Sequence, residues 1–155
     1  MLALVRELAA YEREPDAVVA TASDLENALF GPSPALFGLV AEEAGTVVGF
    51  ALWFLNFSTW VGRHGIYLED LYVRPEARGN GHGRQLLCEL ARIADARGYG
   101  RVEWAVLDWN EPAHRFYESL GAKPLNEWTT WRLDREALHE LASATEQNRD
   151  VDRRV

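Results

Sequence analysis

The stretch from Tyr72 to Leu87 reads YVRPEARGNGHGRQLL and concentrates residues that could bind an anion. Three glycines alternate with two polar residues between two arginines: Arg78, Gly79, Asn80, Gly81, His82, Gly83 and Arg84. Glycines can take a positive φ and let the backbone approach a ligand closely. Successive N–H groups at the start of a helix attract anions, above all phosphates, and arginines add charge and donors. The fragment predicts a phosphate or pyrophosphate site; a plain tight connection is the alternative.

Neither of two common nucleotide-binding motifs describes this fragment. It lacks the Gly-Lys-Ser/Thr sequence that ends a P-loop. Its glycines stand at every second position, whereas the dinucleotide-binding motif spaces them as GxGxxG. An apolar run at 66–73 predicts a strand before the fragment, and a helical stripe from Leu86 to Ala94 follows it. The fragment is therefore expected at a junction between a strand and a helix.

The rest of the chain alternates strands and helices, which indicates a mixed α/β fold. Strands are expected at 36–43, 46–57, 66–73, 101–107 and 127–133. Helices are expected at 4–11, from Ser23 to a stop at Gly31, and at 86–94, 110–118 and 134–144. Ser23 and Glu26 have the spacing of a capping box. The apolar segment 46–57 suits a strand that is covered on both faces.

The length of 155 residues favours one domain, which we expect over 1–145, with a polar and mobile tail at 146–155. A net charge of −8 argues against a nucleic-acid partner, which needs a basic face. No apolar run is long enough for a membrane span or a signal peptide, and the single cysteine allows no internal disulfide. A cytoplasmic protein without a membrane partner is expected. The four histidines lack ligand spacing, so no metal is expected.

Several motifs in a fixed order resemble the GNAT superfamily of acetyltransferases. Residues 78–83, RGNGHG, match its R/Q-x-x-G-x-G/A signature. The order LVRELAAYE, a Trp-containing loop, YLED, the glycine fragment, WNEP, FY and WRL is most like the branch of spermidine/spermine and thialysine N-acetyltransferases. The resemblance extends from Leu4 to the closing helix. It implies an acetyl-CoA-dependent N-acetyltransferase with a mixed central sheet, splayed parallel strands and flanking helices, here lacking the family's first strand.

The resemblance implies that acetyl-CoA lies in a gap between the splayed strands 66–73 and 101–107. The glycine fragment would then hold its pyrophosphate. Other residues that the resemblance places along the cofactor are Leu71, Tyr72 and Val73 through their backbone, Asn110 at the pantetheine amide, and Ala113 and Phe116 in the channel wall. Without the resemblance, Asn110 could simply cap the helix that it begins.

Attack of a neutral amine on a thioester needs a proton acceptor, a donor for the oxyanion and a proton for the leaving thiolate. By resemblance, Glu69 removes the proton through water, the Leu71 N–H stabilises the oxyanion, and Tyr117 protonates the thiolate. Adjacent residues of a strand face opposite sides, so Asp70 receives a supporting role. As alternatives, Glu69 and Asp70 could form a solvated edge, and Tyr117 could be a core aromatic residue beside Phe116.

The expected substrate is a small cationic amine, bound as the resemblance implies by Tyr11, Glu12, Trp60, Glu69 and Asp70. Carboxylates beside aromatic rings suit a cation with a methylene body. Polyamine acetyltransferases carry a late glutamate where this chain has Thr129, so a short diamine or a lysine-like amino acid is an equal candidate. The alternatives are a protein or peptide N-acetyltransferase and a non-catalytic acetyl-CoA-binding regulatory module. A homodimer is expected by resemblance alone.

Overall fold

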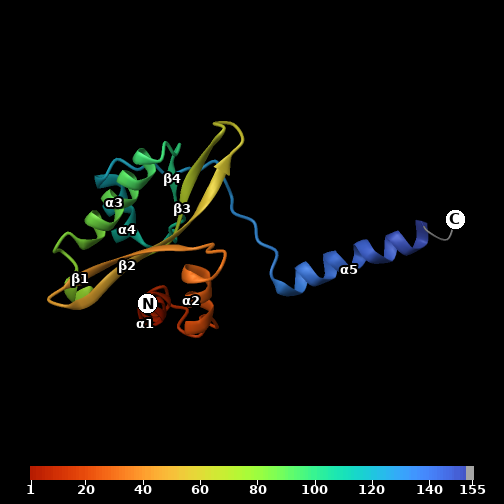
Figure 1. Cartoon of the computed structure of the whole chain (residues 1–155), viewed down its shortest axis with the longest axis horizontal. Coiled ribbons are helices and arrows are strands. Elements are labelled where there is room, and N and C mark those ends of the chain that lie inside the picture. The colour runs from red at the N-terminus through yellow and green to blue at the C-terminus, as the bar shows by residue number, and fades with distance from the viewer. Residues whose placement is uncertain (153–155) are drawn as a thin grey trace. The chain divides into compact units, whose positions relative to one another are not determined.

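The computed structural model describes residues 1–152, with side chains as far as residue 144. The chain divides into two compact units, Met1–Leu107 and Asp108–Val155. The first unit holds α1 (Leu2–Tyr11), α2 (Ala22–Phe30), the 3-10 helix η1 (Pro75–Ala77) and α3 (His82–Ala96) around a sheet (Figure 1). The second unit holds α4 (Glu111–Ser119) and α5 (Arg135–Asp152). No helix within residues 1–152 is long and apolar enough to cross a membrane.

The first unit is built on an open four-stranded sheet with the strand order β1-β2-β3-β4. The strands are β1 (Phe37–Glu43), β2 (Thr46–Ser58), β3 (Arg63–Val73) and β4 (Val102–Glu103). The first three pair antiparallel in sequence order, whereas β4 runs parallel to β3. This mixed sheet confirms the expected α/β fold. In the described chain no strand precedes α1, and β1 lies at an edge of the sheet.

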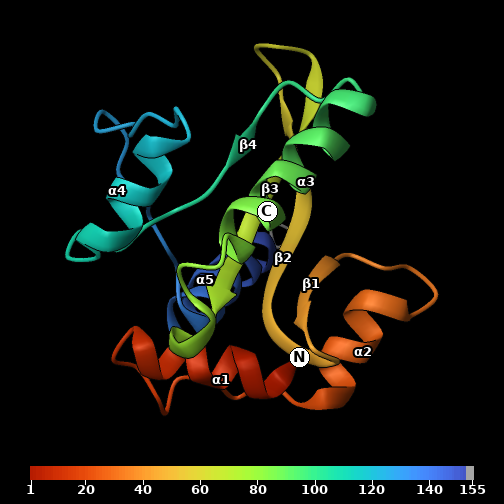
Figure 2. The same ribbon diagram turned by 90° about the vertical axis from the view of Figure 1, so that its left-hand side faces the viewer.

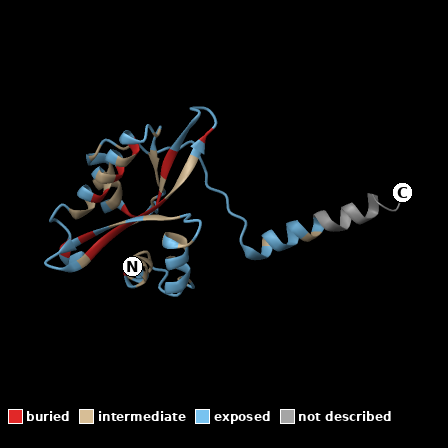
Figure 3. Ribbon diagram, viewed as in Figure 1, coloured by how far each residue is buried: buried red, intermediate tan, exposed pale blue. Residues whose placement is uncertain are grey.

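Helix α3 packs on one face of the sheet, and α1 and α2 pack on the other (Figures 1 and 2). Leu86, Leu90 and Ala94 recur at helical spacing and form the buried stripe of α3. On the opposite face, Leu4 of α1 packs against a cluster around Phe50. Strand β2 is buried over most of its length because it carries apolar side chains on both faces and both faces are covered, as the sequence predicted (Figure 3).

Strand β3 carries one extra residue at Glu69. Leu68 and Asp70 pair with neighbouring residues of β2, which leaves Glu69 without a partner on that strand. Such a β-bulge shifts the alternation of side chains by one position. Before the bulge, Leu68 joins the core beneath α3; after it, Tyr72 joins the core beneath α1. Residues that a regular strand would place on one face therefore lie on opposite faces.

Two of the predicted strands differ in the structure. Strand β4 is limited to Val102–Glu103 instead of 101–107, because β3 lies beside it only at Ile66 and Tyr67. The predicted strand at 127–133 is wrong: these residues form no strand, and none of the described strands pairs with them. The β2–β3 hairpin is longer than predicted, since Arg63 pairs with Ser58 and the connecting loop shrinks to 59–62.

The ends of two helices also differ from the prediction. The capping box of α2 is formed by Thr21 and Asp24: the Thr21 hydroxyl accepts the Asp24 N–H at 3.2 Å, and the Asp24 carboxylate accepts the Thr21 N–H at 2.8 Å. Ser23 and Glu26 have the same spacing, so the pattern alone could not choose between the pairs. Helix α5 continues to Asp152, so much of the expected tail is helical, while 153–155 lie outside the described residues.

Candidate active site

Strands β3 and β4 are paired over two residues only and then separate. The pairing covers Ile66 and Tyr67 of β3. Beyond Tyr67, β3 continues along β2 as far as Val73, and its other edge borders no strand among the described residues. This confirms the expected splay of two parallel strands. The backbone of Leu71, Tyr72 and Val73, predicted to lie along the cofactor, belongs to the open part of this edge.

The fragment 78–84, here called the phosphate turn, connects η1 to α3. Gly79 and Gly81 have φ values of 85° and 87°, a region that favours glycine. A Cβ at either position would meet nothing within 4 Å, so the space over the turn is open. Gly81 is the N-cap of α3, and no side chain caps this helix end, which leaves the N–H groups of the first turn for an anion. The arrangement can hold a phosphate group.

The side chains of the phosphate turn reach in two directions. Gly83 and Arg84 belong to the first turn of α3, and Arg84 is exposed. Asn80 donates from Nδ2 to Oε1 of Glu43 at 3.3 Å, and Nε2 of His82 lies 3.4 Å from Oε2 of Glu43. Glu43 ends β1, so the β1–β2 hairpin is tied to the turn. Sequence reasoning missed Glu43 because it is 37 residues away from Asn80 in the chain.

Arg78 joins residues from the two expected binding sites. Its guanidinium carbon lies 4.7 Å from the ring centroid of Tyr11 and 5.8 Å from that of Tyr72. Its Nε donates to the Val73 carbonyl at 2.9 Å. Arg78 was expected at the pyrophosphate and Tyr11 at the amine. A residue of the expected cofactor site therefore contacts a residue of the expected substrate site.

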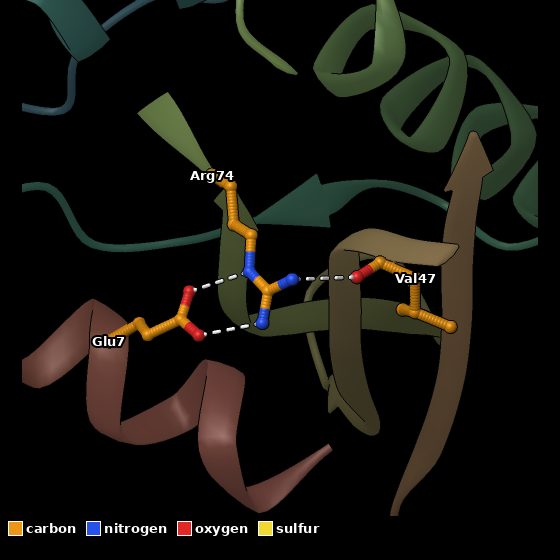
Figure 4. A network of polar contacts seen from close by, with 3 residues as sticks. All are labelled: Glu7, Val47 and Arg74. Carbon is orange, nitrogen blue, oxygen red and sulfur yellow. Dashed lines mark hydrogen bonds and ion pairs between the residues drawn. The ribbon is translucent and has the colours of Figure 1, made fainter. Parts of the chain in front are cut away.

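A second arginine, Arg74, fixes helix α1 against the end of β3 (Figure 4). Its Nε and Nη2 donate to the two carboxylate oxygens of Glu7 at 2.9 and 2.8 Å, and Nη1 donates to the Val47 carbonyl at 3.5 Å. The hydrogen bonds from Arg74 lower the pKa of Glu7 and outweigh the opposing effect of burial. Neither residue was predicted to matter for the site, because 67 positions separate them.

Three carboxylates gather where α1 ends and β3 bulges: Glu12, Glu69 and Asp70, here called the carboxylate cluster. Burial, with the nearby charges of Glu69 and Glu12, raises the pKa of Asp70 to about 6. Burial also raises the pKa of Glu12. Glu69 itself is exposed, so a solvated position describes Glu69 but not Asp70. Among the described residues, no three His, Cys, Asp or Glu side chains are arranged to hold a metal ion.

Trp60 does not lie near this cluster within its own unit. It stands in the 59–62 tip of the β2–β3 hairpin and is 90% exposed. The strand from Arg63 to Glu69 spans roughly 20 Å at about 3.4 Å per residue, so the tip and the cluster are at opposite ends of it. Four of the five predicted substrate residues therefore lie at the end of α1 or on the second half of β3, whereas Trp60 occupies an exposed loop.

The remaining predicted residues lie on α4 in the second unit. Asn110 is the N-cap of α4: its Oδ1 accepts the Ala113 N–H at 3.3 Å, and the residue is buried. The capping role considered for Asn110 is thus confirmed. Phe116 and Tyr117 are half-buried, with ring centroids 5.1 Å apart and planes tilted by 55°. The two rings are in contact, but neither side chain belongs to the buried core.

Known proteins are similar to this chain in sequence and in fold. Residues 3–122 match the Acetyltransferase (GNAT) family. A thialysine N-epsilon-acetyltransferase of Bos taurus is 41% identical over 153 residues, covering 92% of this chain and 89% of that protein. Spermidine/spermine N(1)-acetyltransferase-like protein 1 of Homo sapiens is 34% identical over 152 residues, covering 92% of this chain and 22% of that protein.

Among solved structures, an integron cassette protein from the mobile metagenome of V. cholerae has a TM-score of 0.76 and 32% sequence identity to this chain. The match covers 91% of this chain and 88% of that one. This likeness is in keeping with the mixed α/β fold. Members of the matched family use acetyl-CoA as the acetyl donor. The chain belongs to the acetyltransferase (GNAT) family and is an N-acetyltransferase.

Proposed function

We propose that the chain transfers the acetyl group of acetyl-CoA to a primary amine of a small cationic molecule. One observation carries the proposal: the phosphate turn and the carboxylate cluster flank the same open stretch of β3, residues 71–73. Acetyl-CoA supplies the acetyl group as a thioester, and its pyrophosphate suits the turn. The two curated relatives bear the names of thialysine and of spermidine and spermine, which are cationic amines.

In this proposal Asp70 accepts a proton from the substrate ammonium, while Glu12 and Glu69 hold the cation. A carboxylate with a pKa of about 6 is a stronger base than one at its ordinary value, and it is still mostly ionised at pH 7. An incoming cation also relieves the repulsion among the three carboxylates. Glu69, which the resemblance favours as the base acting through water, remains the second candidate for proton removal.

The other roles are carried over from the resemblance. The Leu71 N–H is proposed as the oxyanion donor, and its place on the open edge of β3 supports this. Tyr117 is proposed as the proton donor to the leaving thiolate. Ala113 and Phe116 are proposed at the channel wall, and Asn110 would contact the pantetheine amide in addition to capping α4.

A short diamine or a lysine-like amino acid is the proposed substrate class. Three carboxylates close together favour a substrate with more than one positive charge or a long cationic side chain. Thr129 stands where polyamine acetyltransferases carry a glutamate, which removes one charge that a longer polyamine would use.

We also propose that the protein forms a homodimer. Large apolar side chains between residues 125 and 141 are exposed, by 90% at Trp131: Leu125, Trp128, Trp131, Leu133, Leu138 and Leu141. Monomeric proteins rarely expose a run of this size, and a second copy of the chain is the partner that the resemblance suggests. Light scattering should give twice the 17.5 kDa of one chain; a monomeric mass would contradict the proposal.

The reaction is tested by incubating the purified protein with acetyl-CoA and one amine at a time. The panel holds putrescine, spermidine, lysine, thialysine and a short peptide, and mass spectrometry detects the acetylated amine. A thiol reagent is less suitable because Cys88 is exposed and would also react. Tyr117→Phe should lower kcat by about 100-fold or more while acetyl-CoA affinity stays within about threefold. Tyr99→Phe, a half-buried tyrosine beside His64, is the matched control and should keep its activity.

Two results would contradict the proposed reaction, and a third would contradict only the role given to Tyr117. Acetyl-CoA binding without turnover of any amine would indicate a regulatory module, and turnover of the peptide alone would indicate a protein N-acetyltransferase. Equal activity of Tyr117→Phe and the wild type would remove Tyr117 from the chemistry while leaving the overall reaction in place.

A further inference from the structure

Arg78 is placed so that its edges and its face can serve different partners at once. The Nε edge donates to the Val73 carbonyl at 2.9 Å, and the face lies 4.7 Å from the Tyr11 ring centroid. The side chain is otherwise exposed, which leaves the edge with the two terminal nitrogens for an anion. A guanidinium can stack on an aromatic ring and bind a phosphate with its edge at the same time.

Arg74 supplies a second link between the same parts of the unit. Arg74 and Arg78 flank η1, the short helix that leads into the phosphate turn. The Arg74 side chain donates two hydrogen bonds to the Glu7 carboxylate, at 2.9 and 2.8 Å. The backbone N–H of Arg74 donates to the Val48 carbonyl at 2.9 Å. The side chains of Arg74 and Glu7 are only 27% and 34% exposed, so the pair is partly shielded from solvent.

Both links end on helix α1, which carries residues of the amine site. Glu7 lies in the middle of α1, Tyr11 is its last residue, and Glu12 is its C-cap. The Glu12 charge contributes to the raised pKa of Asp70, so the end of the helix reaches the carboxylate cluster. A shift of α1 would therefore move Tyr11 and Glu12 relative to Asp70.

We propose that the Arg78–Tyr11 contact, supported by the Arg74–Glu7 pair, couples occupation of the phosphate turn to binding at the carboxylate cluster. A pyrophosphate on the terminal nitrogens of Arg78 fixes the guanidinium plane, and the plane fixes Tyr11 and the end of α1. The amine then binds a site that is already ordered, with less entropy to lose. The inference rests on the proposed function, since it needs a pyrophosphate in the turn and an amine at the carboxylates.

The coupling is measured as a ratio of two dissociation constants for thialysine, without and with saturating CoA. CoA carries the pyrophosphate but no acetyl group, so no turnover disturbs the titration by calorimetry. Wild-type protein should bind thialysine about fivefold or more tightly with CoA present. Tyr11→Leu removes the ring and should bring this ratio close to one. Tyr11→Phe keeps the ring and should preserve the ratio even if amine affinity falls.

Two further variants separate coupling from simple loss of binding. Glu7→Gln weakens the second link and should reduce the ratio to an intermediate value. Arg84→Lys alters the other arginine of the turn, which is exposed in the first turn of α3; it should weaken CoA binding and leave the ratio unchanged. Arg78→Lys, at an exposed position, should lower the ratio as well and replaces Tyr11→Leu if that variant does not fold.

Each outcome has a definite meaning. A ratio that stays at the wild-type value in Tyr11→Leu or Arg78→Lys overturns the coupling and leaves the proposed function intact. A wild-type ratio of one shows that the two sites are independent and overturns it too. If CoA binds but none of putrescine, spermidine, lysine and thialysine does in any state, the proposed function fails and the inference fails with it.

Discussion

The carboxylate cluster and the phosphate turn stand before and after residues 71–73 of β3, and they are built by different means. The cluster is acidic and partly buried, and it depends on tertiary contacts: the bulge at Glu69 turns Asp70 toward α1, whose end brings Glu12 beside it. The turn is basic and exposed, and it depends on local backbone: two glycines with positive φ lead into an uncapped helix end.

Because the two sites are built differently, their affinity for a charged ligand has different physical sources. The carboxylates repel one another and are poorly solvated, so the folded chain is destabilised until a cation or a proton arrives. The turn offers backbone dipoles that cost little to expose to water, and its affinity for phosphate is open to screening by salt. Substitutions should therefore affect chemistry and pH response at the cluster, and cofactor affinity at the turn.

The largest effect is expected from Asp70→Asn. Removing the proton acceptor should lower kcat/KM for the best amine by about 100-fold or more at pH 7.5. The wild-type kcat/KM should fall as pH drops through about 6, because protonated Asp70 cannot accept a proton. Glu69→Gln is the matched variant and should cost less, about tenfold, while retaining the acid limb. A larger loss in Glu69→Gln than in Asp70→Asn would restore Glu69 as the base.

A smaller effect is expected at the phosphate turn from Gly81→Ala. The φ of 87° costs an alanine roughly 1–2 kcal/mol, so the turn should relax and acetyl-CoA affinity should fall about tenfold. Gly98→Ala is the matched control: its φ is 65°, a Cβ there also meets nothing within 4 Å, and it follows the other end of α3. Calorimetry with acetyl-CoA should show unchanged affinity for Gly98→Ala. Equal losses in both variants would assign the effect to general strain.

The smallest effect is expected in the stability of the fold. The pKa of Asp70 is raised from its ordinary 3.8 to about 6, so its stabilising contribution is present below pH about 4 and is lost as pH rises through 6. Asp70→Asn should therefore be more stable than the wild type at pH 8 by roughly 1–2 kcal/mol, with the difference vanishing near pH 4. Urea unfolding at both pH values measures this. If Asp70→Asn were less stable than the wild type at pH 8, the ionised carboxylate of Asp70 would have to make stabilising contacts in the folded protein.

Local features of this molecule could be predicted from sequence, whereas features that join distant segments could not. The glycine spacing and the apolar run before it correctly indicated a strand, a tight turn and a helix, because those signals lie within a few residues of each other. The Arg74–Glu7 and Asn80–Glu43 contacts join residues 67 and 37 positions apart and leave no local pattern. The strand expected at 127–133 failed for the same reason, since a strand needs a neighbour that its own residues do not specify.

The bulge at Glu69 also determines which kinds of genetic change the site can tolerate. A substitution there alters one exposed side chain, and deletion of its codon would remove the bulge without exchanging the two faces of β3, because Leu68 and Asp70 already pair with neighbouring residues of β2. Deletion of a residue in the regular part of the strand, such as Tyr67, would instead shift the alternation by one and turn Ile66 away from the core beneath α3. The bulge is therefore a position within the sheet where the chain can lose a residue and keep both faces, as it can at the exposed hairpin tip at 59–62.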